Sequence, residues 1–393
     1  MNGIVVKINR ETTAFADVRR EWQELFAASG VAPFLSWEWS RAWFESFGEG
    51  KLPHFVTAHS GNRLVGILPM FSEEKRRLGM RIKRLGLVGE GIGGADYLGL
   101  IARAEDRPEV LSAMLERLFS DEGRDAMRFE YVAADSDFAA ELRRPKLATD
   151  NGFGRMRETV SAACPQIDLA AGWDAVLQQS KRSSNFKRRL KQIEKLPGYE
   201  FRSVTDPADT SAAFERFLSL HQRRWAESGG SELSGHPRLI EFQRRLVPDI
   251  AAAGLLRFDE LWFGGECRGS IYGLDDGRTF YYYNAGYDLG SANLSVGLVL
   301  LGLSVRASVT RGVTLYDFLR GDEAYKSDWA HRRAELVNVS LHRNARLAFA
   351  DEGIGRAISA AKTFSAGLLP SQTTETFKAW RRAWRRNYQF SGR

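Results

Sequence analysis

The spacing of apolar residues predicts two stretches that repeat the same order of elements. Alternating apolar positions indicate strands, and apolar positions three or four residues apart indicate helices. The first stretch is expected to contain a strand at 3–8, helices at 15–28 and 37–47, a hairpin of 55–59 and 64–71, a glycine-rich segment at 85–94 leading into 96–101, a helix at 108–119 and a strand at 127–132. Ser36 is positioned to cap the second of these helices.

The second stretch begins with a basic helix at 173–196, which Pro197 and Gly198 end. Its remaining elements are predicted as a strand at 199–204, helices at 208–226 and 237–252, strands at 255–263, 267–274 and 279–287, a helix at 295–309 and a strand at 313–319. The order is the same in both stretches, about 200 residues apart, which indicates internal duplication of an α/β unit. The seam is expected near 155–172.

Composition narrows the class of protein. The 393 residues suit two or three domains, and 44% hydrophobic with 27% charged residues is typical of a globular protein. The longest apolar run, 294–305, is too short to span a bilayer, and residues 1–10 lack a signal-peptide core, so a cytoplasmic location is expected. Two cysteines, Cys164 and Cys267, are interpreted as buried thiols, and six scattered histidines predict no metal site.

The net charge of +7 is concentrated in two segments. Residues 181–195 carry seven cations against Glu194, with Phe186, Leu190 and Ile193 on one helical face. The cationic face could meet an anion such as the 3′-phosphate of CoA, an anionic glycan or an aminoacyl-tRNA, or it could simply be solvated.

The second cationic segment is the tail, 371–393, which carries six cations against Glu375. Phe377, Trp380 and Trp384 form a stripe at helical spacing among the arginines. This pattern fits a helix on a membrane surface, and it equally fits a helix packed against its own domain.

Two regions could carry chemistry. A tyrosine-rich strand, 281–283, leads to a helix start with Ser295 and Gly297, where free backbone N–H groups could receive a phosphate. The alternative is a core helix with a serine cap. The polar loop 316–329 could supply a general base, an acid and an anion contact, or it could be a solvated loop with local salt bridges.

Residues 317–323, with Tyr325, Lys326 and Trp329, resemble the closing signature of the CelD/BcsL-type acetyltransferases associated with cellulose and exopolysaccharide synthesis. These belong to the GNAT (Gcn5-related N-acetyltransferase) superfamily and are related to the FemAB-type transferases. Segments 34–39, 94–98, 183–190 and 221–225 resemble further parts of the same family.

The resemblance implies an α/β (α+β) fold of two tandem GNAT units, each a mixed central sheet flanked by helices. We expect an N-terminal GNAT-like domain at 1–165, a C-terminal one at 166–350 and a basic aromatic tail at 351–393. In this family the strand expected at 279–287 splays from the one at 313–319 and opens a V-shaped slot for the thioester of acetyl-CoA or another acyl-CoA. The donor contacts expected by position are Tyr283, Asn284, Ser295, Val296 and Gly297.

The first copy is not expected to bind CoA, because Asp106 is anionic and Pro108 lacks an N–H at the corresponding helix start. Catalytic roles are predicted for Asp317 or Asp322 as base and for Tyr325 as the acid that protonates the departing thiolate.

The acceptor cleft is expected between the two copies. Its predicted contacts are Asp96, Tyr97, Arg320 and Lys326. No metal is expected.

The function implied is N-acylation of an amine on a cell-envelope or exopolysaccharide precursor, in the cytoplasm or at the inner membrane face through the tail. Two alternatives stay open. A FemAB-like enzyme would move an aminoacyl group from tRNA to a peptidoglycan precursor, which the basic helix favours. A catalytically inactive duplicate would bind glycan or a synthase subunit.

Overall fold

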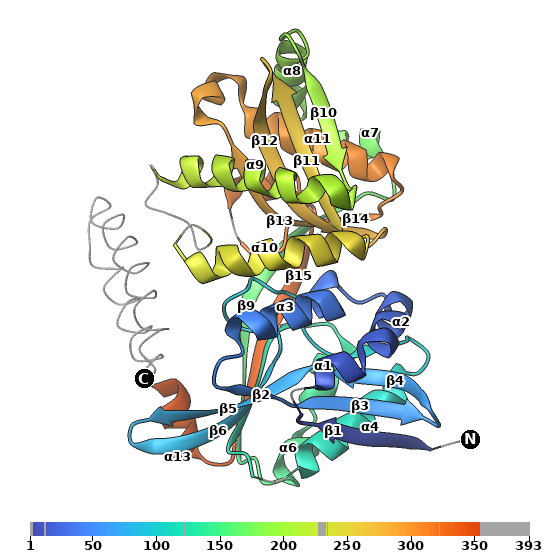
Figure 1. Cartoon of the computed structure of the whole chain (residues 1–393), viewed down its shortest axis with the longest axis vertical. Helices are drawn as coiled ribbons and strands as arrows, with labels where there is room; N and C mark the ends of the chain where they lie inside the picture. The colour runs from blue at the N-terminus through green and yellow to red at the C-terminus, as the bar shows by residue number, and fades with distance from the viewer. Residues whose placement is uncertain are drawn as a thin grey trace.

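The chain forms two halves stacked along the long axis of the molecule (Figure 1). The computed structural model describes residues 3–11, 13–121, 123–226, 233, 235–321 and 323–353. The tail at 371–393, and with it the predicted aromatic helix, lies outside these residues.

The first half contains the elements from β1 to α6. In chain order they are β1 (Ile4–Asn9), α1 (Ala14–Asp17), α2 (Arg19–Ser29), the 3-10 helix η1 (Pro33–Leu35), α3 (Trp37–Phe47), β2 (Lys51–Pro53), β3 (Phe55–Ser60), β4 (Arg63–Leu68), β5 (Met70–Arg77), β6 (Met80–Leu87), β7 (Ile101–Ala102), α4 (Arg107–Ser120), β8 (Ala126–Ala133), α5 (Asp137–Leu142) and α6 (Pro145–Thr149). Ser36 caps α3 as predicted, since its hydroxyl accepts a hydrogen bond from Trp39 N.

The second half contains the elements from α7 to α12, and two long strands, β9 and β15, connect the halves. In chain order these are β9 (Arg155–Asp168), α7 (Trp173–Gln179), α8 (Ser183–Ile193), β10 (Glu200–Val204), α9 (Pro207–Ala226), α10 (Pro237–Ala252), β11 (Leu256–Phe263), β12 (Glu266–Asp275), β13 (Thr279–Tyr287), η2 (Leu289–Leu294), α11 (Val296–Thr310), β14 (Leu315–Asp317), α12 (Ala324–Ser327) and β15 (Arg332–His342). The described chain ends with α13 (Ala345–Ala348) and η3 (Phe349–Gly353).

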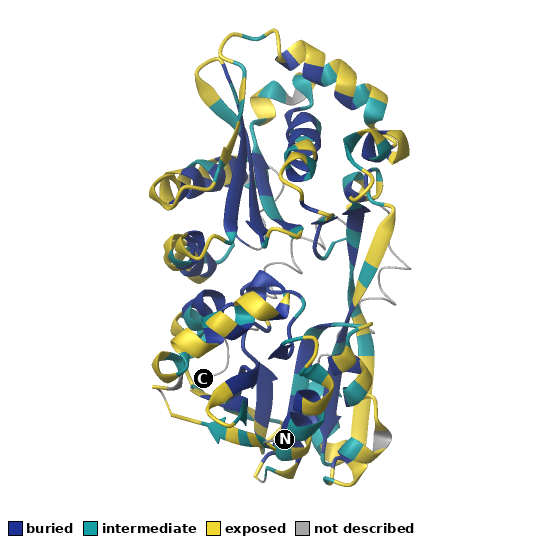
Figure 2. Ribbon diagram, turned by 90° about the vertical axis from the view of Figure 1, so that its right-hand side faces the viewer, coloured by how far each residue is buried: buried dark blue, intermediate teal, exposed yellow. Residues whose placement is uncertain are grey.

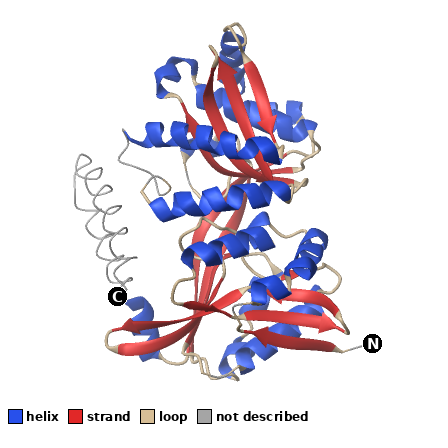
Figure 3. Cartoon of the chain, in the orientation of Figure 1, coloured by secondary structure: helices blue, strands red, loops and turns tan. Residues whose placement is uncertain are grey.

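Both halves have the predicted order of elements. In the second half β10, β11, β12 and β13 pair antiparallel, and β14 then runs parallel to β13. In the first half β1, β3 and β4 pair antiparallel, as do β5 and β6, and β8 then runs parallel to β6. The predicted mixed α/β architecture with a repeated unit is confirmed (Figure 3).

The seam between the units is a strand. β9 covers most of the predicted seam and pairs with β15 along almost its whole length. β9 also pairs with β14, and β15 also pairs with β8, so one eleven-stranded sheet runs through both halves of the described chain. The expected boundary at 165/166 therefore falls within β9. Neither strand was predicted from the sequence.

Three predicted elements differ from the structure. The basic helix 173–196 is two helices, because Ser180 is extended and its hydroxyl accepts a hydrogen bond from Arg182 N. The strand 64–71 is divided at Pro69 into β4 and β5, which lie in different sheets. Of the segment 96–101, only Ile101 is in a strand.

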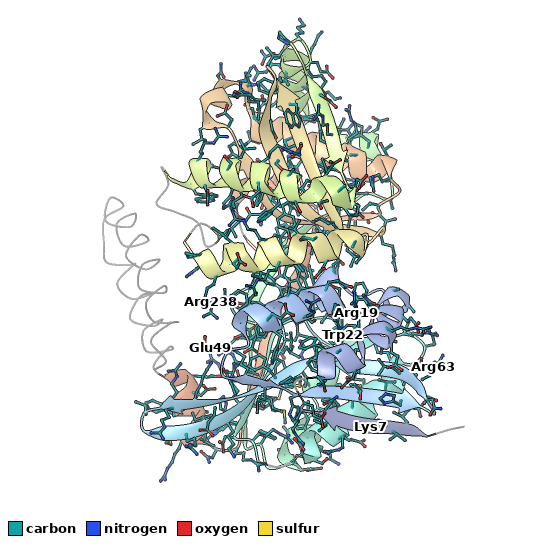
Figure 4. All side chains as sticks on the ribbon, viewed as in Figure 1. Lys7, Arg19, Trp22, Glu49, Arg63 and Arg238 are labelled. Carbon is teal, nitrogen blue, oxygen red and sulfur yellow. The ribbon has the colours of Figure 1, made fainter. Side chains whose placement is uncertain are left out.

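A shared hydrophobic core joins the halves. It includes Trp39 of α3 and Phe242 of α10, whose ring centroids are 5.5 Å apart. At the edge of this contact, Arg238 of α10 points toward Glu49 and donates a hydrogen bond to Ser46 O (Figure 4). The two halves are thus packed as one body rather than joined by a linker.

Helices cover both faces of the sheet in the second half, so the inner strands β11, β12 and β13 are largely buried (Figure 2). α9 and α10 cover one face, and α11 covers the other beneath α7 and α8. At the crossing of α8 and α11, a Cβ on Gly302 would lie 2.2 Å from the Phe186 ring, so glycine permits the close approach. None of the helices in the described ranges is long and apolar enough to cross a membrane.

Candidate active site

The sheet of the second half opens between β13 and β14. These two strands pair only from Thr279 to Tyr281, where Tyr281 is opposite Asp317. From Tyr282 onward, β13 has β12 as its sheet neighbour on one side, and β14 has already ended. We call this opening the wedge and the Tyr281–Asp317 pair its vertex. The splayed strands expected from the family resemblance are therefore present.

An irregularity in β13 decides which tyrosine faces the wedge. The register with β12 shifts by one residue. Tyr282 lies opposite Gly273 and Asn284 lies opposite Tyr272, so Tyr283 is an extra, unpaired residue of a β-bulge. Tyr282 consequently lines the cavity on the α11 side. Tyr283 instead points between the halves, where its hydroxyl donates to Gly93 O of the first half and accepts from Gln243 of α10.

A cavity of about 410 Å³ fills the wedge beside α11. Its lining is mainly apolar and aromatic, with a few charged groups at the α8 and α9 side. The lining residues are Arg182, Asn185, Arg224, Ile271, Tyr282, Ala285, Tyr287, Asp288, Leu289, Ser295, Val296, Gly297, Leu298, Leu300, Leu301, Tyr325, Asp328 and Trp329. Of the predicted donor contacts, Ser295, Val296 and Gly297 line this cavity, whereas Tyr283 and Asn284 are not among its lining residues.

The start of α11 forms one end of the cavity. The N–H groups of a first helical turn have no carbonyl partners within the helix. Ser295 precedes the helix in a left-handed conformation, with φ 56°, and its side chain makes no capping hydrogen bond. The predicted serine cap is therefore wrong, because a left-handed backbone turns the hydroxyl away from the first-turn amides. Gly297 lies against the Tyr287 ring, where a Cβ would be 3.0 Å from Cε1.

Two arginines line the cavity. Arg182, just before α8, pairs with Asp328 at 2.6 Å, and its side chain is half exposed. Arg224 of α9 lies over the Tyr287 ring, 4.1 Å from the centroid. The basic helix thus contributes its N-terminal end to the cavity, while Phe186, Leu190 and Ile193 are buried as predicted.

Tyr325 closes the other end of the cavity. Its hydroxyl is 3.5 Å from that of Tyr282, and both rings pack on Phe318. Burial raises the pKa of Tyr282 to about 12 and raises that of Tyr325 as well. Both phenols are therefore protonated at neutral pH and can donate hydrogen bonds.

The other predicted catalytic and substrate residues lie at the vertex rather than in this cavity. Asp317 is 1% exposed and bonded to Tyr97, and Asp96 is ion-paired with Arg320. Lys326 is 4% exposed and contacts Glu323 and Arg320 O. Asp322 lies outside the described residues.

Among the lining residues that the sequence did not indicate are Tyr282, Tyr287, Arg224 and Asp328. Tyr282 and Tyr287 belong to the strand predicted at 279–287, but the shift in register is invisible in the sequence. In the part of the chain that the structure describes, no group of three or more His, Cys, Asp or Glu side chains could hold a metal ion.

Comparison with known proteins identifies the class. Residues 180–327 match the acetyltransferase (GNAT) domain family. These residues include the wedge, the basic helix and the loop beyond β14. None of the curated proteins matches the chain.

Solved structures with the same fold cover both halves. FemX is 10% identical with a TM-score of 0.57, over 84% of this chain and 96% of that one. A conserved protein of unknown function from Bacteroides thetaiotaomicron is 11% identical with a TM-score of 0.52, over 86% of this chain and 100% of that one. The C-terminal domain assigned to a lysylphosphatidylglycerol synthetase of Agrobacterium fabrum is 12% identical with a TM-score of 0.51, over 88% of this chain and 96% of that one.

The family match and the fold agree on a GNAT-type acetyltransferase domain in the second half of the chain, with the wedge at its centre.

Proposed function

We propose that the protein is an N-acyltransferase that takes an acyl group from acyl-CoA, held in the wedge cavity, and passes it to an amine. The observation that carries the proposal is the cavity itself, which joins the start of α11 to the open edge of β13. Similarity to GNAT domains, which generally use acyl-CoA, supports the same donor.

The residues present fit the donor. The first turn of α11 would hold the pyrophosphate, and Arg182 and Arg224 would add positive charge. Tyr287, which touches α11, and Tyr282 are five residues apart on β13, which corresponds to roughly 16 Å at about 3.3 Å per residue. An extended pantetheine arm has a comparable reach, so the thioester would lie beside Tyr282 and Tyr325.

The proposed chemistry is direct transfer. The amine nitrogen attacks the thioester carbonyl carbon, the C–N bond forms and the C–S bond breaks. Tyr325 donates its hydroxyl proton to the departing thiolate and is then reprotonated from solvent. For the proton that the amine loses, Asp322 or water is the better candidate, because Asp317 already accepts three hydrogen bonds.

For the acceptor we propose an amine on a cell-envelope or exopolysaccharide precursor. The support is the resemblance of residues 317–329 to the CelD/BcsL-type acetyltransferases. The tail at 371–393 is proposed to associate weakly with the inner membrane face, from its sequence alone. Salt-sensitive binding to anionic vesicles, lost on truncation after Pro370, is the expected result.

A FemAB-like aminoacyl transfer from tRNA is the second candidate. One feature favours it: α8 presents Lys187, Arg188 and Lys191 on its exposed side and begins at the cavity. A polyanionic carrier of the donor could lie along this face.

Thermal unfolding with acetyl-CoA, longer acyl-CoAs and tRNA separates the candidates. A ligand at 100 times its Kd stabilises the folded protein by about 2.7 kcal/mol. We expect stabilisation by acyl-CoA, followed by release of free thiol when amine acceptors are added. Stabilisation by tRNA alone would support the second candidate, and no effect of either would leave an inactive binding protein.

A further inference from the structure

The vertex of the wedge is tied to the first half through Asp317. Its carboxylate accepts hydrogen bonds from the Tyr97 hydroxyl at 2.6 Å, from Gln166 Nε2 at 2.7 Å and from Leu319 N at 2.6 Å. Tyr97 belongs to the first half and Gln166 to the connecting strand β9. The residue that ends the pairing of β13 with β14 is therefore held from three directions.

A second tie follows three residues later. Arg320 Nε lies 2.9 Å from Asp96 Oδ1, and the guanidinium carbon lies 3.9 Å from the centroid of the Tyr131 ring. Asp96 and Tyr131 both belong to the first half. Lys326 donates to Arg320 O at 3.0 Å, which joins the loop beyond β14 to the same cluster.

Backbone strain is concentrated at these ties. Among the described residues, five other than glycine have a positive φ, and three of them are Tyr97 at 57°, Tyr131 at 55° and Leu319 at 53°. Such conformations persist where the surroundings fix them, and they often mark functional sites. The left-handed turn at Leu319 directs the chain away from β13 just past the vertex.

We propose that the first half acts as a positioning element for the donor site, in which the Tyr97–Asp317 and Asp96–Arg320 contacts hold the turn after β14 away from β13 and so keep the wedge open. Asp317 and Tyr97 are thus positioning residues. The proposal rests on the proposed function, since it assumes that the wedge receives the donor. It also gives a role to segment 94–98, which the donor cavity does not use.

The competing role for Asp317 is that of general base. Burial raises the pKa of Asp317, while hydrogen bonds from Tyr97 and Gln166 oppose this shift. A base must have a lone pair directed at the acceptor, whereas both oxygens of Asp317 already accept hydrogen bonds from the protein. The geometry favours the positioning role.

Asp317→Asn distinguishes the two roles. The amide has the same shape and can keep all three contacts: its oxygen accepts from Leu319 N, and its NH2 group donates to Tyr97 Oη and to the turned amide of Gln166. As a positioning residue, Asp317 can be replaced with less than a tenfold loss in kcat and an unchanged pH profile. A loss of 100-fold or more, with the acidic limb of the profile removed and acyl-CoA affinity intact, would make Asp317 the base and overturn the proposal.

Tyr97→Phe tests the tie without touching the carboxylate. Losing one buried hydrogen bond is expected to weaken acyl-CoA binding and lower kcat, each by about tenfold. Tyr272→Phe is the matched control, because its buried hydroxyl donates to Gln243 within the second half at 2.7 Å and does not line the cavity. Unchanged affinity and kcat in Tyr97→Phe would contradict the proposal.

Hydrogen exchange provides a readout that does not depend on the substrate. Tyr97→Phe should speed amide exchange in 318–327 and 282–287, and Tyr272→Phe should leave 318–327 unchanged. Exchange that is the same in Tyr97→Phe as in the wild type would overturn the positioning role. If the wild type neither binds nor uses acyl-CoA while Tyr97→Phe still speeds exchange, the proposed function fails and the tie stands.

Discussion

Gly297→Asp tests whether the start of α11 receives the phosphates of the donor. Two opposite unit charges 4 Å apart interact by about 4 kcal/mol at an effective dielectric constant of 20, and like charges repel equally. Salt and solvent reduce this, so a carboxylate at residue 297 should weaken acyl-CoA binding by roughly 30-fold to several hundredfold. The expected loss concerns binding and not folding.

The effect on stability should be small because three contributions nearly cancel. Replacing a helical glycine stabilises a helix by up to about 1 kcal/mol. A carboxylate in the first turn adds roughly 0.3–1 kcal/mol. The new Cβ, however, meets the Tyr287 ring at 3.0 Å, and crowding of this kind costs on the order of 1 kcal/mol.

Gly297→Asn is the matched control, since it adds the same bulk without the charge. Titration calorimetry with acetyl-CoA should show a much larger loss of affinity for the Asp variant than for the Asn variant, and the difference should shrink at high salt. Equal affinities in the two variants, with both folded, would refute a phosphate site at the start of α11.

Three further predictions follow from the geometry. Tyr325→Phe should lower kcat by roughly 100-fold with acyl-CoA affinity unchanged, and wild-type turnover would remove this residue from the mechanism. Burial lowers the pKa of His54 and of His221 to about 4, so both imidazoles are neutral in the folded protein near neutral pH. The unfolded chain then binds more protons, and the unfolding free energy should fall as the pH drops from 6.5 toward 4. His54→Gln should flatten this pH dependence in chemical denaturation, and an unchanged slope would contradict the neutral, buried state of His54. Gly302→Ala should lower the melting temperature by displacing α8, with partial rescue by Phe186→Leu, and a melting temperature like that of the wild type would contradict the packing.

Much of the fold could be predicted because it is locally encoded. The helices of both halves have apolar residues at helical spacing, and the order of elements then shows the duplication. β9 and β15 could not be found in this way. Each crosses between the halves and is stabilised mainly by pairing with the other, more than 160 residues away in the chain, so the local pattern contains little of their structure.

The candidate site was predicted in part for the same reason. Ser295, Val296 and Gly297 are consecutive and begin a helix, so a linear pattern indicates them. The choice of Tyr282 over Tyr283 depends on a shift in register against β12, which is a property of the pair of strands. The partners of Asp317 come from three separate parts of the chain, and no spacing in the sequence brings them together.

The two copies differ at the parallel pair of strands, which is β6 and β8 in the first half and β13 and β14 in the second. This difference indicates separate roles for the two copies. In the first half, β6 pairs with β8 only from Arg84 to Gly86, and a buried Arg84–Glu90 ion pair lies against β6 there. A Cβ on Gly86 would lie 2.6 Å from the Glu90 carboxylate, so that carboxylate already lies against β6. α4 has Pro108, which lacks an N–H, in its first turn. The first half instead contributes the loop after Glu90, whose Asp96 and Tyr97 contact Arg320 and Asp317 at the vertex of the second half's wedge.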